Sequence, residues 1–285
     1  MIIDCHVHLN NYHDQIAVSL DESLDKLQAE MADNGVDYSL VLTSYLVNSQ
    51  RPSTAQVVRA VEKIPSLGVV AGISYSKYKQ RDLRELADFL EDGLVKGLKL
   101  YPGYEPFYPH DPRLRVVYDL AEEFSVPVMI HSGDTFSPNG KVKYSHPLQV
   151  DEVAVDHRNV NFVICHLGNP WLVDCMEVVY KNSNVYADFS GLVLGDFTEA
   201  FEDYMEEQIA EVLLYAGDTN FLLYGTDWPI CSMKSYLDFV RQLKLTDEDR
   251  HKIMYENARK LFKLHHLPEI AAPVVPGAPT SAPQR

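Results

Sequence analysis

The sequence contains no apolar run that approaches the roughly 20 residues needed for a helix to span a bilayer. Its start also lacks the basic, apolar and small-residue sections of a secretory signal peptide, because Ile2 and Ile3 already read as a buried strand. Only 4 cysteines occur in 285 residues, and they form no C-x-x-C pair. Disulfides and cysteine zinc sites are therefore not expected, and the prediction is a cytoplasmic protein with no membrane partner.

Positive charge is also scarce, since 25 Lys and Arg face 41 Asp and Glu, for a net charge of -16. A field of this sign repels phosphate backbones, so nucleic acid is not an expected partner. A small-molecule substrate is expected, and it can be anionic because a metal or an arginine reverses the sign locally. From Pro268 the chain is rich in Pro, Ala, Gly and Ser without periodicity. Residues 268–285 are therefore predicted to be a disordered tail after one folded domain, residues 1–267.

Apolar, β-branched segments alternate with helical patterns over most of the chain. Eight strands separated by crossover segments imply parallel pairing, and continuous apolar character suits strands covered on both faces. The predicted architecture is therefore α/β, a (β/α)8 TIM barrel with its active site at the carboxyl ends of the strands. The expected strands are residues 2–8, 38–44, 68–75, 97–101, 126–131, 160–166, 185–190 and 221–227. The expected helices are residues 21–34, 82–92, 111–124, 171–181 and 198–215, with extra C-terminal helices at 234–245 and 247–264.

The first expected strand carries two histidines, His6 and His8. Side chains on a strand alternate faces, so these two imidazoles share one face while Cys5 and Val7 point the other way. Imidazoles at positions i and i+2 of a strand end can reach one metal ion. The alternative is a polar pair satisfied by ordinary hydrogen bonds.

Three further expected strands end in a residue that commonly binds metals: His131, His166 and Asp227. A single histidine after an apolar run is more often structural. Four strand ends that all supply an imidazole or a carboxylate are difficult to attribute to chance, because the carboxyl ends of barrel strands converge on one site. Together they predict a metal centre.

Lys99 lies between two leucines of the fourth expected strand and therefore points into the barrel if the leucines pack on helices. A buried ammonium without a partner is costly. Lys99 is thus expected either to form a salt bridge with an interior carboxylate such as Asp188 or to be chemically modified.

The ligand-type residues in this order resemble the amidohydrolase superfamily. The segments 96–102, 128–133, 165–168 and 224–229 are similar to its amidohydrolase-related (amidohydrolase 2) branch of metal-dependent TIM barrels, which includes hydrolases, lactonases and metal-dependent decarboxylases. The resemblance covers about residues 1–264. It implies metal ligation by His6, His8, His131 and Asp227, and it gives His166 the role of a second-metal ligand or of an acid/base. In two-metal members a carboxylated lysine bridges the ions, and Lys99 matches that position.

The site and the resemblance together predict an enzyme that uses one or two divalent ions. Zinc suits a His-rich site best, and Mn or Fe is compatible with the same ligands. The leading hypothesis is a hydrolase of an amide, ester or lactone, in which Asp227 moves protons to and from a metal-activated water and His166 polarises the substrate. The alternatives are a non-oxidative decarboxylase of an aromatic or unsaturated acid, which is a lyase, and a non-catalytic metal-binding barrel. Related barrels are often dimers, so a homodimer is a candidate assembly.

Other residues near the strand ends are candidates for contact with the substrate. Asp188 and Ser190 share a face of the seventh expected strand and are expected to support the metal ligands. Cys165, one residue before His166, is expected to point away from the metal as a small core residue. The predicted substrate-binding residues are Tyr101, Tyr104, His146, Trp228 and Arg51.

Overall fold

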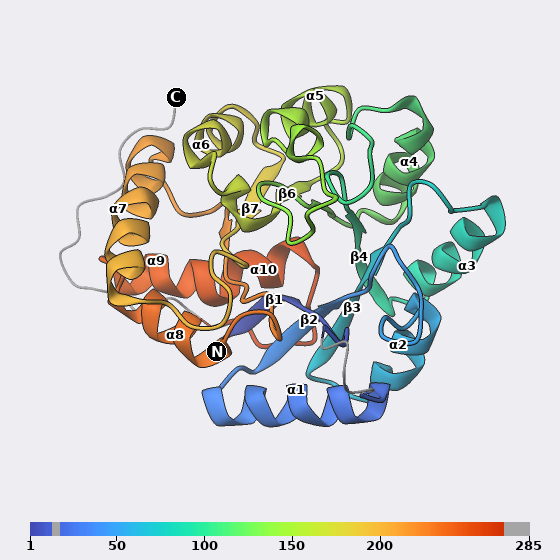
Figure 1. Ribbon diagram of the computed structural model, residues 1–285, viewed down its shortest axis with the longest axis horizontal. Helices are drawn as coiled ribbons and strands as arrows, with labels where there is room; N and C mark the ends of the chain where they lie inside the picture. The colour runs from blue at the N-terminus through green and yellow to red at the C-terminus, as the bar shows by residue number, and fades with distance from the viewer. Residues whose placement is uncertain (13–17, 271–285) are drawn as a thin grey trace.

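A computed structural model describes residues 1–12 and 18–270 and confirms the (β/α)8 barrel. Its eight parallel strands follow one another in chain order around a single sheet, seen in Figure 1. Backbone hydrogen bonds from Cys5 N to Tyr224 O and from Asp227 N to His6 O join the first and last strands. The strands are β1 (Ile3–Val7), β2 (Tyr38–Leu42), β3 (Leu67–Gly72), β4 (Val95–Leu100), β5 (Val128–Ile130), β6 (Phe162–Ile164), β7 (Val185–Asp188) and β8 (Leu222–Leu223).

Helices surround the sheet on the outside, as the ribbon in Figure 1 shows. Local signals set some of their ends: Ser19 and Glu22 form a reciprocal cap at the start of α1, and Gly35 ends it with a left-handed φ of 70°. The patterns do not predict α2 and α5, because each is short and most of its apolar residues are valines, which favour strands. The helices are α1 (Leu20–Asn34), α2 (Thr54–Val61), α3 (Gln80–Glu91), α4 (Arg115–Phe124), α5 (Leu148–Asp156), α6 (Leu172–Lys181), α7 (Glu199–Ala216), α8 (Met233–Gln242), α9 (Asp247–His251) and α10 (Asn257–Leu261).

Two apolar clusters hold the barrel together, one between sheet and helices and one inside the sheet. On β4, Leu98 and Leu100 belong to the outer cluster, so Lys99 points inward as the alternation predicts. Lys99 lies in register with Met129 of β5, which belongs to the inner cluster. The interior is therefore filled with side chains below the level of Lys99, and open space is confined to the carboxyl ends of the strands.

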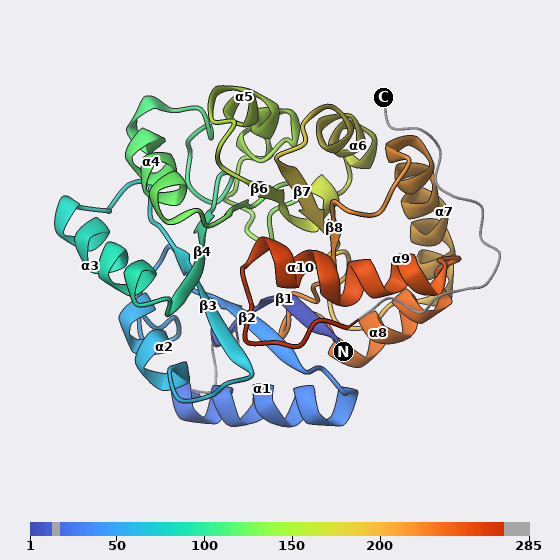
Figure 2. The ribbon, with the colours of Figure 1, turned by 180° about the vertical axis from the view of Figure 1, so that it is seen from behind.

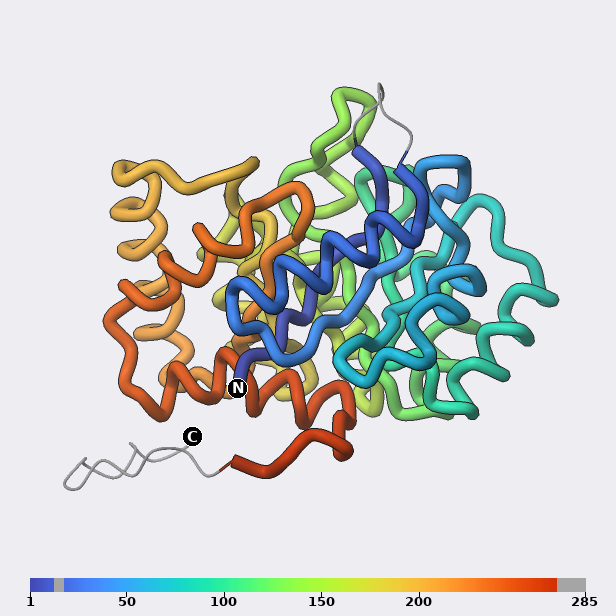
Figure 3. The backbone as a smooth tube through the Cα atoms, turned by 90° about the horizontal axis from the view of Figure 1, so that it is seen from below, coloured from blue at the N-terminus to red at the C-terminus, as the bar shows by residue number. Residues whose placement is uncertain are grey.

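The two terminal helices close the opposite end of the barrel. Figure 2 shows α9 and α10 lying across it, joined by a π-helical turn over Lys252–Glu256. Tyr255, Ala258 and Phe262 from this segment pack into the inner cluster. In the side view of Figure 3, the light green segment after β5 rises on the far side of the molecule from these helices. The site end and the closed end are thus on opposite sides.

The described chain makes contacts slightly beyond the predicted domain end. Tyr255 Oη donates a hydrogen bond to Pro268 O at 2.6 Å, and Arg259 pairs with Glu269 at 3.3 Å. The described chain thus extends three residues beyond the predicted domain end, and the disorder of the tail stays a prediction. The rest of the predicted tail, residues 271–285, lies outside the described residues. Among the helices formed by residues 1–12 and 18–270, none is both long and apolar enough to cross a membrane.

Candidate metal centre and active site

The end of β1 carries an irregularity that changes which side chains face inward. Asp4 is in register with Ser39 but Val7 with Val41, so β1 has one extra residue between these pairs. This is the arrangement of a β-bulge, which locally breaks the alternation of faces. Cys5 shares the interior cluster with Ile3, as alternation along the start of β1 requires, whereas Val7 beyond the bulge belongs to the outer cluster. The prediction that Cys5 points away from the interior is wrong for this reason.

His6 of β1, His8 directly after this strand and Asp227 after β8 converge. His8 Nε2 lies 3.0 Å and His6 Nε2 lies 3.7 Å from Asp227 Oδ1. The three residues offer ligand atoms that all lie within 4.8 Å of one another. Asp227 Oδ1 is buried and accepts no hydrogen bond of normal geometry from the described residues. An orphaned carboxylate oxygen facing two imidazole nitrogens is the arrangement expected where a cation belongs.

The outer ring nitrogens of these histidines are held by acceptors. His6 Nδ1 lies 3.0 Å from Asp188 Oδ2, and His8 Nδ1 lies 2.9 Å from Leu42 O. Because a carboxylate and a carbonyl only accept, each Nδ1 carries the hydrogen. In the neutral form of each ring, Nε2 then keeps its lone pair directed at Asp227, which is the tautomer that a metal ligand requires.

Two more histidines line the same space. His166 donates from Nδ1 to Ser190 O at 3.0 Å, so its Nε2 is also the free nitrogen. His131 donates from Nε2 to Asp134 O at 2.9 Å and therefore keeps its lone pair on Nδ1. Their ring centroids lie 5.0 Å apart. Both imidazoles are thus neutral and adjacent, although neither belongs to the tight cluster of His6, His8 and Asp227.

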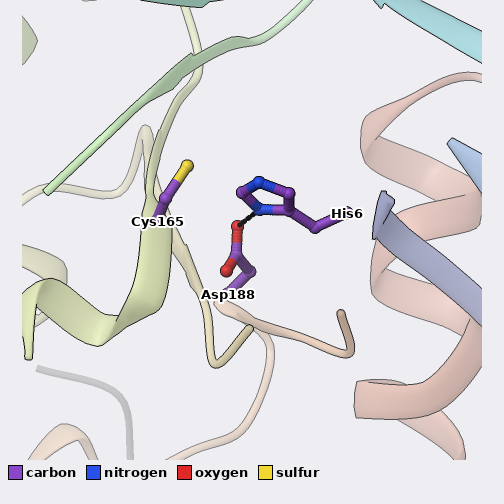
Figure 4. Close-up of side chains that lie close together, drawn as sticks. All are labelled: His6, Cys165 and Asp188. Carbon is purple, nitrogen blue, oxygen red and sulfur yellow. Dashed lines mark hydrogen bonds and ion pairs between the residues drawn. The ribbon is translucent and has the colours of Figure 1, made fainter. Parts of the chain in front are cut away.

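Left-handed backbone conformation after two strands, β6 and β8, turns side chains toward the site that simple alternation along a strand would direct elsewhere. His166 and Leu167 have φ values of 62° and 50°, and Asp227 has a φ of 69°. Such values are uncommon for residues other than glycine. At the end of β6 the change of conformation brings both Cys165 and the next residue, His166, to the interior. Figure 4 shows the Cys165 thiol on the same side as the His6 ring and the Asp188 carboxylate. The prediction that Cys165 points away from the metal site is therefore wrong.

Lys99 has a different partner from the one expected. Its Nζ donates to Cys165 Sγ at 2.6 Å, and no carboxylate in residues 1–12 or 18–270 lies within ion-pairing distance. The predicted salt bridge to Asp188 does not form, because the Asp188 oxygens accept hydrogen bonds from His6, His166 and Ser190 instead. Burial raises the pKa of the Cys165 thiol well above its usual value, so Lys99 faces a neutral sulfur.

A cavity of about 270 Å³ opens above these groups at the carboxyl end of the barrel. Of the predicted substrate-binding residues, Tyr101, Tyr104 and Arg51 line it. Trp228 lines a neighbouring cavity of about 390 Å³, and His146 packs on Trp171 and lines neither. Residues that line the main cavity but were not singled out from the sequence include Tyr12, Tyr45, Asn10, Asn169 and Gly191.

Gly191 is the most constrained of these. Its φ is 62°, and an added Cβ would lie 2.6 Å from His166 Nδ1 and 2.9 Å from Asp227 Oδ2. Both the backbone conformation and the space therefore require glycine. The sequence offered one indication that Gly191 lies at the site, which is its position directly after Ser190 at the end of a predicted strand.

Burial sets the charge states of the site. It lowers the pKa of His6 to about 4, with a further contribution from the Lys99 charge. Burial likewise lowers the pKa values of His131 and His166. For Asp227, burial raises the pKa, but the hydrogen bond from His8 and the positive charges of His6 and His8, which act when these rings are protonated, outweigh it and hold the pKa below its usual range. Neutral imidazoles and an ionised carboxylate are the forms that bind a metal.

These shifts predict how the stability of the metal-free protein depends on pH. A buried histidine stays neutral in the folded protein but takes up a proton near pH 6.5 in the unfolded chain. It therefore lowers the free energy of unfolding as the pH falls from 6.5 toward the pKa of the folded state, which is about 4 for His6. His131 and His166 act in the same direction. Asp4 opposes them, because burial raises its pKa to about 7. With three groups against one, we expect the free energy of unfolding to decrease between pH 6.5 and 4.

Urea unfolding of chelator-treated protein, followed by circular dichroism across this pH range, measures the effect. Asp4→Asn is the informative variant, because it removes the opposing carboxyl and should make the decrease steeper. A free energy of unfolding that stays constant or rises as the pH falls would contradict the buried, neutral state of the histidines.

Comparison with known proteins gives one family and several fold relatives. A family model described as amidohydrolase matches residues 3–264. The gamma-resorcylate decarboxylase of Rhizobium radiobacter is 24% identical over 191 residues, which cover 57% of this chain and 58% of that protein. The match therefore spans less than two thirds of this relative.

Two solved structures share the fold at low sequence identity. A probable 2-pyrone-4,6-dicarboxylic acid hydrolase from Acinetobacter baumannii, with citric acid bound, has a TM-score of 0.66 at 15% identity and covers 92% of this chain and 99% of its own. A dihydroxybenzoic acid decarboxylase from Polaromonas sp. JS666, with bound manganese and the inhibitor 2-nitroresorcinol, has a TM-score of 0.65 at 13% identity, covering 93% and 97%. At these identities the likeness shows the barrel fold alone.

Proposed function

The chain belongs to the amidohydrolase family, and from this premise we propose that it is a metal-dependent, non-oxidative decarboxylase of a hydroxylated aromatic acid. The observation that carries the proposal is the composition of the main cavity. The cluster of His6, His8 and Asp227 lies at its base, and tyrosines with one arginine, Arg51, form its walls. The sequence placed hydrolysis first, but the similarity to a decarboxylase that acts on an aromatic acid favours the alternative.

The donor set fits a divalent ion. His6 Nε2, His8 Nε2 and the orphaned Asp227 Oδ1 would hold it, and His131 Nδ1 is a further available donor. When bound, the ion supplies a Lewis acid that polarises and orients a substrate carboxylate and its neighbouring hydroxyl. Imidazole and carboxylate donors suit zinc or manganese, and a fold relative holds manganese. The carboxylation of Lys99 stays a prediction, and its contact with Cys165 favours a single ion.

Decarboxylation breaks the bond between the ring carbon and the carboxylate, releases CO₂ and leaves the electron pair on the ring carbon. That carbon must then take up a proton from a group within hydrogen-bond reach of it. Asp227 and His166 both line the cavity, and the lone pair on His166 Nε2 can take up a proton from water or from the substrate hydroxyl and then pass it to the ring carbon. We assign proton delivery to this pair, with Asp227 also a metal ligand.

Arg51 supplies the positive charge for an anionic substrate. It is half-buried at the cavity wall, and its guanidinium lies 5.9 Å from the Tyr12 ring centroid. No carboxylate within the described part of the chain forms an ion pair with it. A planar guanidinium beside tyrosine rings suits an aromatic carboxylate, which it can meet through two parallel hydrogen bonds.

We expect Arg51→Met to raise KM about 10- to 100-fold with a small change in kcat. A charged hydrogen bond contributes about 1.5–3 kcal/mol, which corresponds to a change of that size in affinity. Steady-state kinetics on the identified substrate measure it. Arg59→Met, an exposed arginine on α2, is the matched control and should leave KM unchanged. An effect of Arg51→Met on kcat alone would contradict a role in substrate binding.

A hydrolase that opens a lactone or amide is the second candidate. The feature that favours it is Asp227 Oδ1, which is free of hydrogen bonds among the described residues and lies where it could take a proton from a water. The likeness to a probable pyrone dicarboxylic acid hydrolase is one of fold.

Incubation in deuterium oxide separates the two reactions. The protein is loaded with Mn²⁺ or Zn²⁺ and offered hydroxybenzoic acids, including gamma-resorcylate, beside a panel of lactones and amides. We expect CO₂ release from a hydroxybenzoic acid and one deuterium on the ring carbon that lost the carboxylate. Hydrolysis of a lactone or amide without CO₂ release from any acid would overturn the proposal in favour of the second candidate.

A further inference from the structure

Ser190, just after β7, makes a hydrogen-bond pattern that no other described serine makes. Its Oγ lies 2.9 Å from Nδ1 of His6 and 2.9 Å from Nδ1 of His166. It also lies 2.5 Å from Asp188 Oδ1. The serine is fully buried, so water does not compete for these contacts. One hydroxyl thus touches histidines from two strands, β1 and the end of β6, together with a carboxylate of its own strand.

The hydrogens of this cluster can be placed from its acceptors. Both Nδ1 atoms are donors, His6 to Asp188 Oδ2 and His166 to Ser190 O. The Ser190 hydroxyl has one hydrogen, and Asp188 Oδ1 is the contact that can only accept it. The two lone pairs of Oγ then accept from the same two N–H groups, so each imidazole N–H is shared between Oγ and its other acceptor in a bifurcated hydrogen bond. Every polar atom of the cluster is satisfied in this single arrangement.

Asp188 fixes the backbone around the same point. Its Oδ1 accepts from the backbone N of His166 at 3.1 Å and from the backbone N of Ser190 at 3.0 Å. The first of these bonds anchors His166, whose left-handed φ turns its ring into the site. Ser190 therefore connects the ring of His166 to the carboxylate that also holds its main chain.

We propose that Ser190 is a positioning residue that holds His6 and His166 together in the tautomer with Nε2 free, and so links the metal ligand to the acid/base group. The inference rests on the metal site of the proposed function. Removing the hydroxyl leaves each imidazole only one acceptor and deprives Asp188 of a short hydrogen bond. Metal binding and the state of His166 should consequently change together. Loss of a hydrogen-bond partner behind a metal ligand typically lowers metal affinity 10- to 100-fold.

Ser190→Ala tests the proposal on purified, full-length protein. The first readout is the dissociation constant for Zn²⁺, from competition with a chromogenic chelator, where we expect a rise of about 10-fold. The second is the proton–nitrogen correlation spectrum of the histidine rings in metal-free protein, where the Nδ1–H signals of both His6 and His166 should shift. Ser39→Ala is the control, because Ser39 is equally buried and its hydroxyl has no hydrogen-bond partner among the described residues.

The outcomes separate this inference from the proposed function. A dissociation constant within about 2-fold of wild type, with both ring signals unmoved, overturns the positioning role, since a space-filling serine would give that result. Neither readout requires catalytic turnover, and the ring signals require no metal. The role of Ser190 can therefore be tested even if the protein is inactive or binds no metal. If Ser190→Ala does not fold, Ser190→Cys replaces it, because a thiol fills a similar volume but is a poor hydrogen-bonding group. The same two measurements, with the same expected results, then test the proposal.

Discussion

We expect Asp227→Asn to lower kcat about 10³-fold and to weaken metal binding at the same time. General acid/base groups contribute roughly 10² to 10⁴ to rate, and this carboxylate is in addition the only anionic member of its ligand cluster. An amide has nearly the same shape but neither the charge nor the basicity of the carboxylate. Steady-state kinetics and metal analysis of the same preparation measure both effects.

Asp196→Asn is the control for this prediction. Asp196 is exposed on the loop after β7, at the same end of the barrel, and does not line the cavity. It should behave as wild type in both measurements. If Asp227→Asn retained full turnover and full metal content, the assignment of this carboxylate to the chemistry would be wrong, whichever reaction the protein performs.

We expect His166→Asn to lower kcat by about 10² to 10⁴ while leaving the metal content unchanged. The reason is geometric: His166 lies beside the cluster of His6, His8 and Asp227 without being part of it. Its Nε2 is free to carry a proton because Nδ1 is held by Ser190 O. Metal analysis and single-turnover kinetics on the same sample distinguish lost chemistry from a lost ion.

His110→Asn is the matched substitution, because His110 is exposed and pairs with Glu152 away from the cavity. It should change neither quantity. If His166→Asn instead lost its metal, His166 would be a ligand, and the second-metal role implied by the family resemblance would be the better description.

The fold could be predicted from the sequence because each barrel strand has a local sequence pattern of its own. Each is an apolar, β-branched segment, and the segments are separated by lengths of chain that only a parallel crossover uses. The patterns missed α2 and α5, which are short helices whose apolar residues are mostly valines, and valine favours strands. The local signals for α2 were the capping box of Ser53 and Gln56 and the helical spacing of Val57, Val58 and Val61.

The ligand-type residues were also accessible, because each ends a strand in the sequence and the barrel gathers strand ends on one face. Lys99 was correctly placed inside by the alternation of β4. The partner of Lys99 was not predictable, since it depends on Cys165. Counting back from an inward His166 put Cys165 outside, but Cys165 shares the inner cluster with Val163, and it is His166, with its left-handed φ, that departs from the alternation.

The sequence by itself thus determined the barrel and the six residues His6, His8, Lys99, His131, His166 and Asp227 as candidates for one site. The tertiary structure alone decided how they meet. A bulge in β1 and left-handed turns at His166 and Asp227 reset which side chains face inward, because an extra residue or a reversed φ shifts the alternation by one. Those irregularities depend on hydrogen bonds between strands far apart in the chain, such as those made by Asp188.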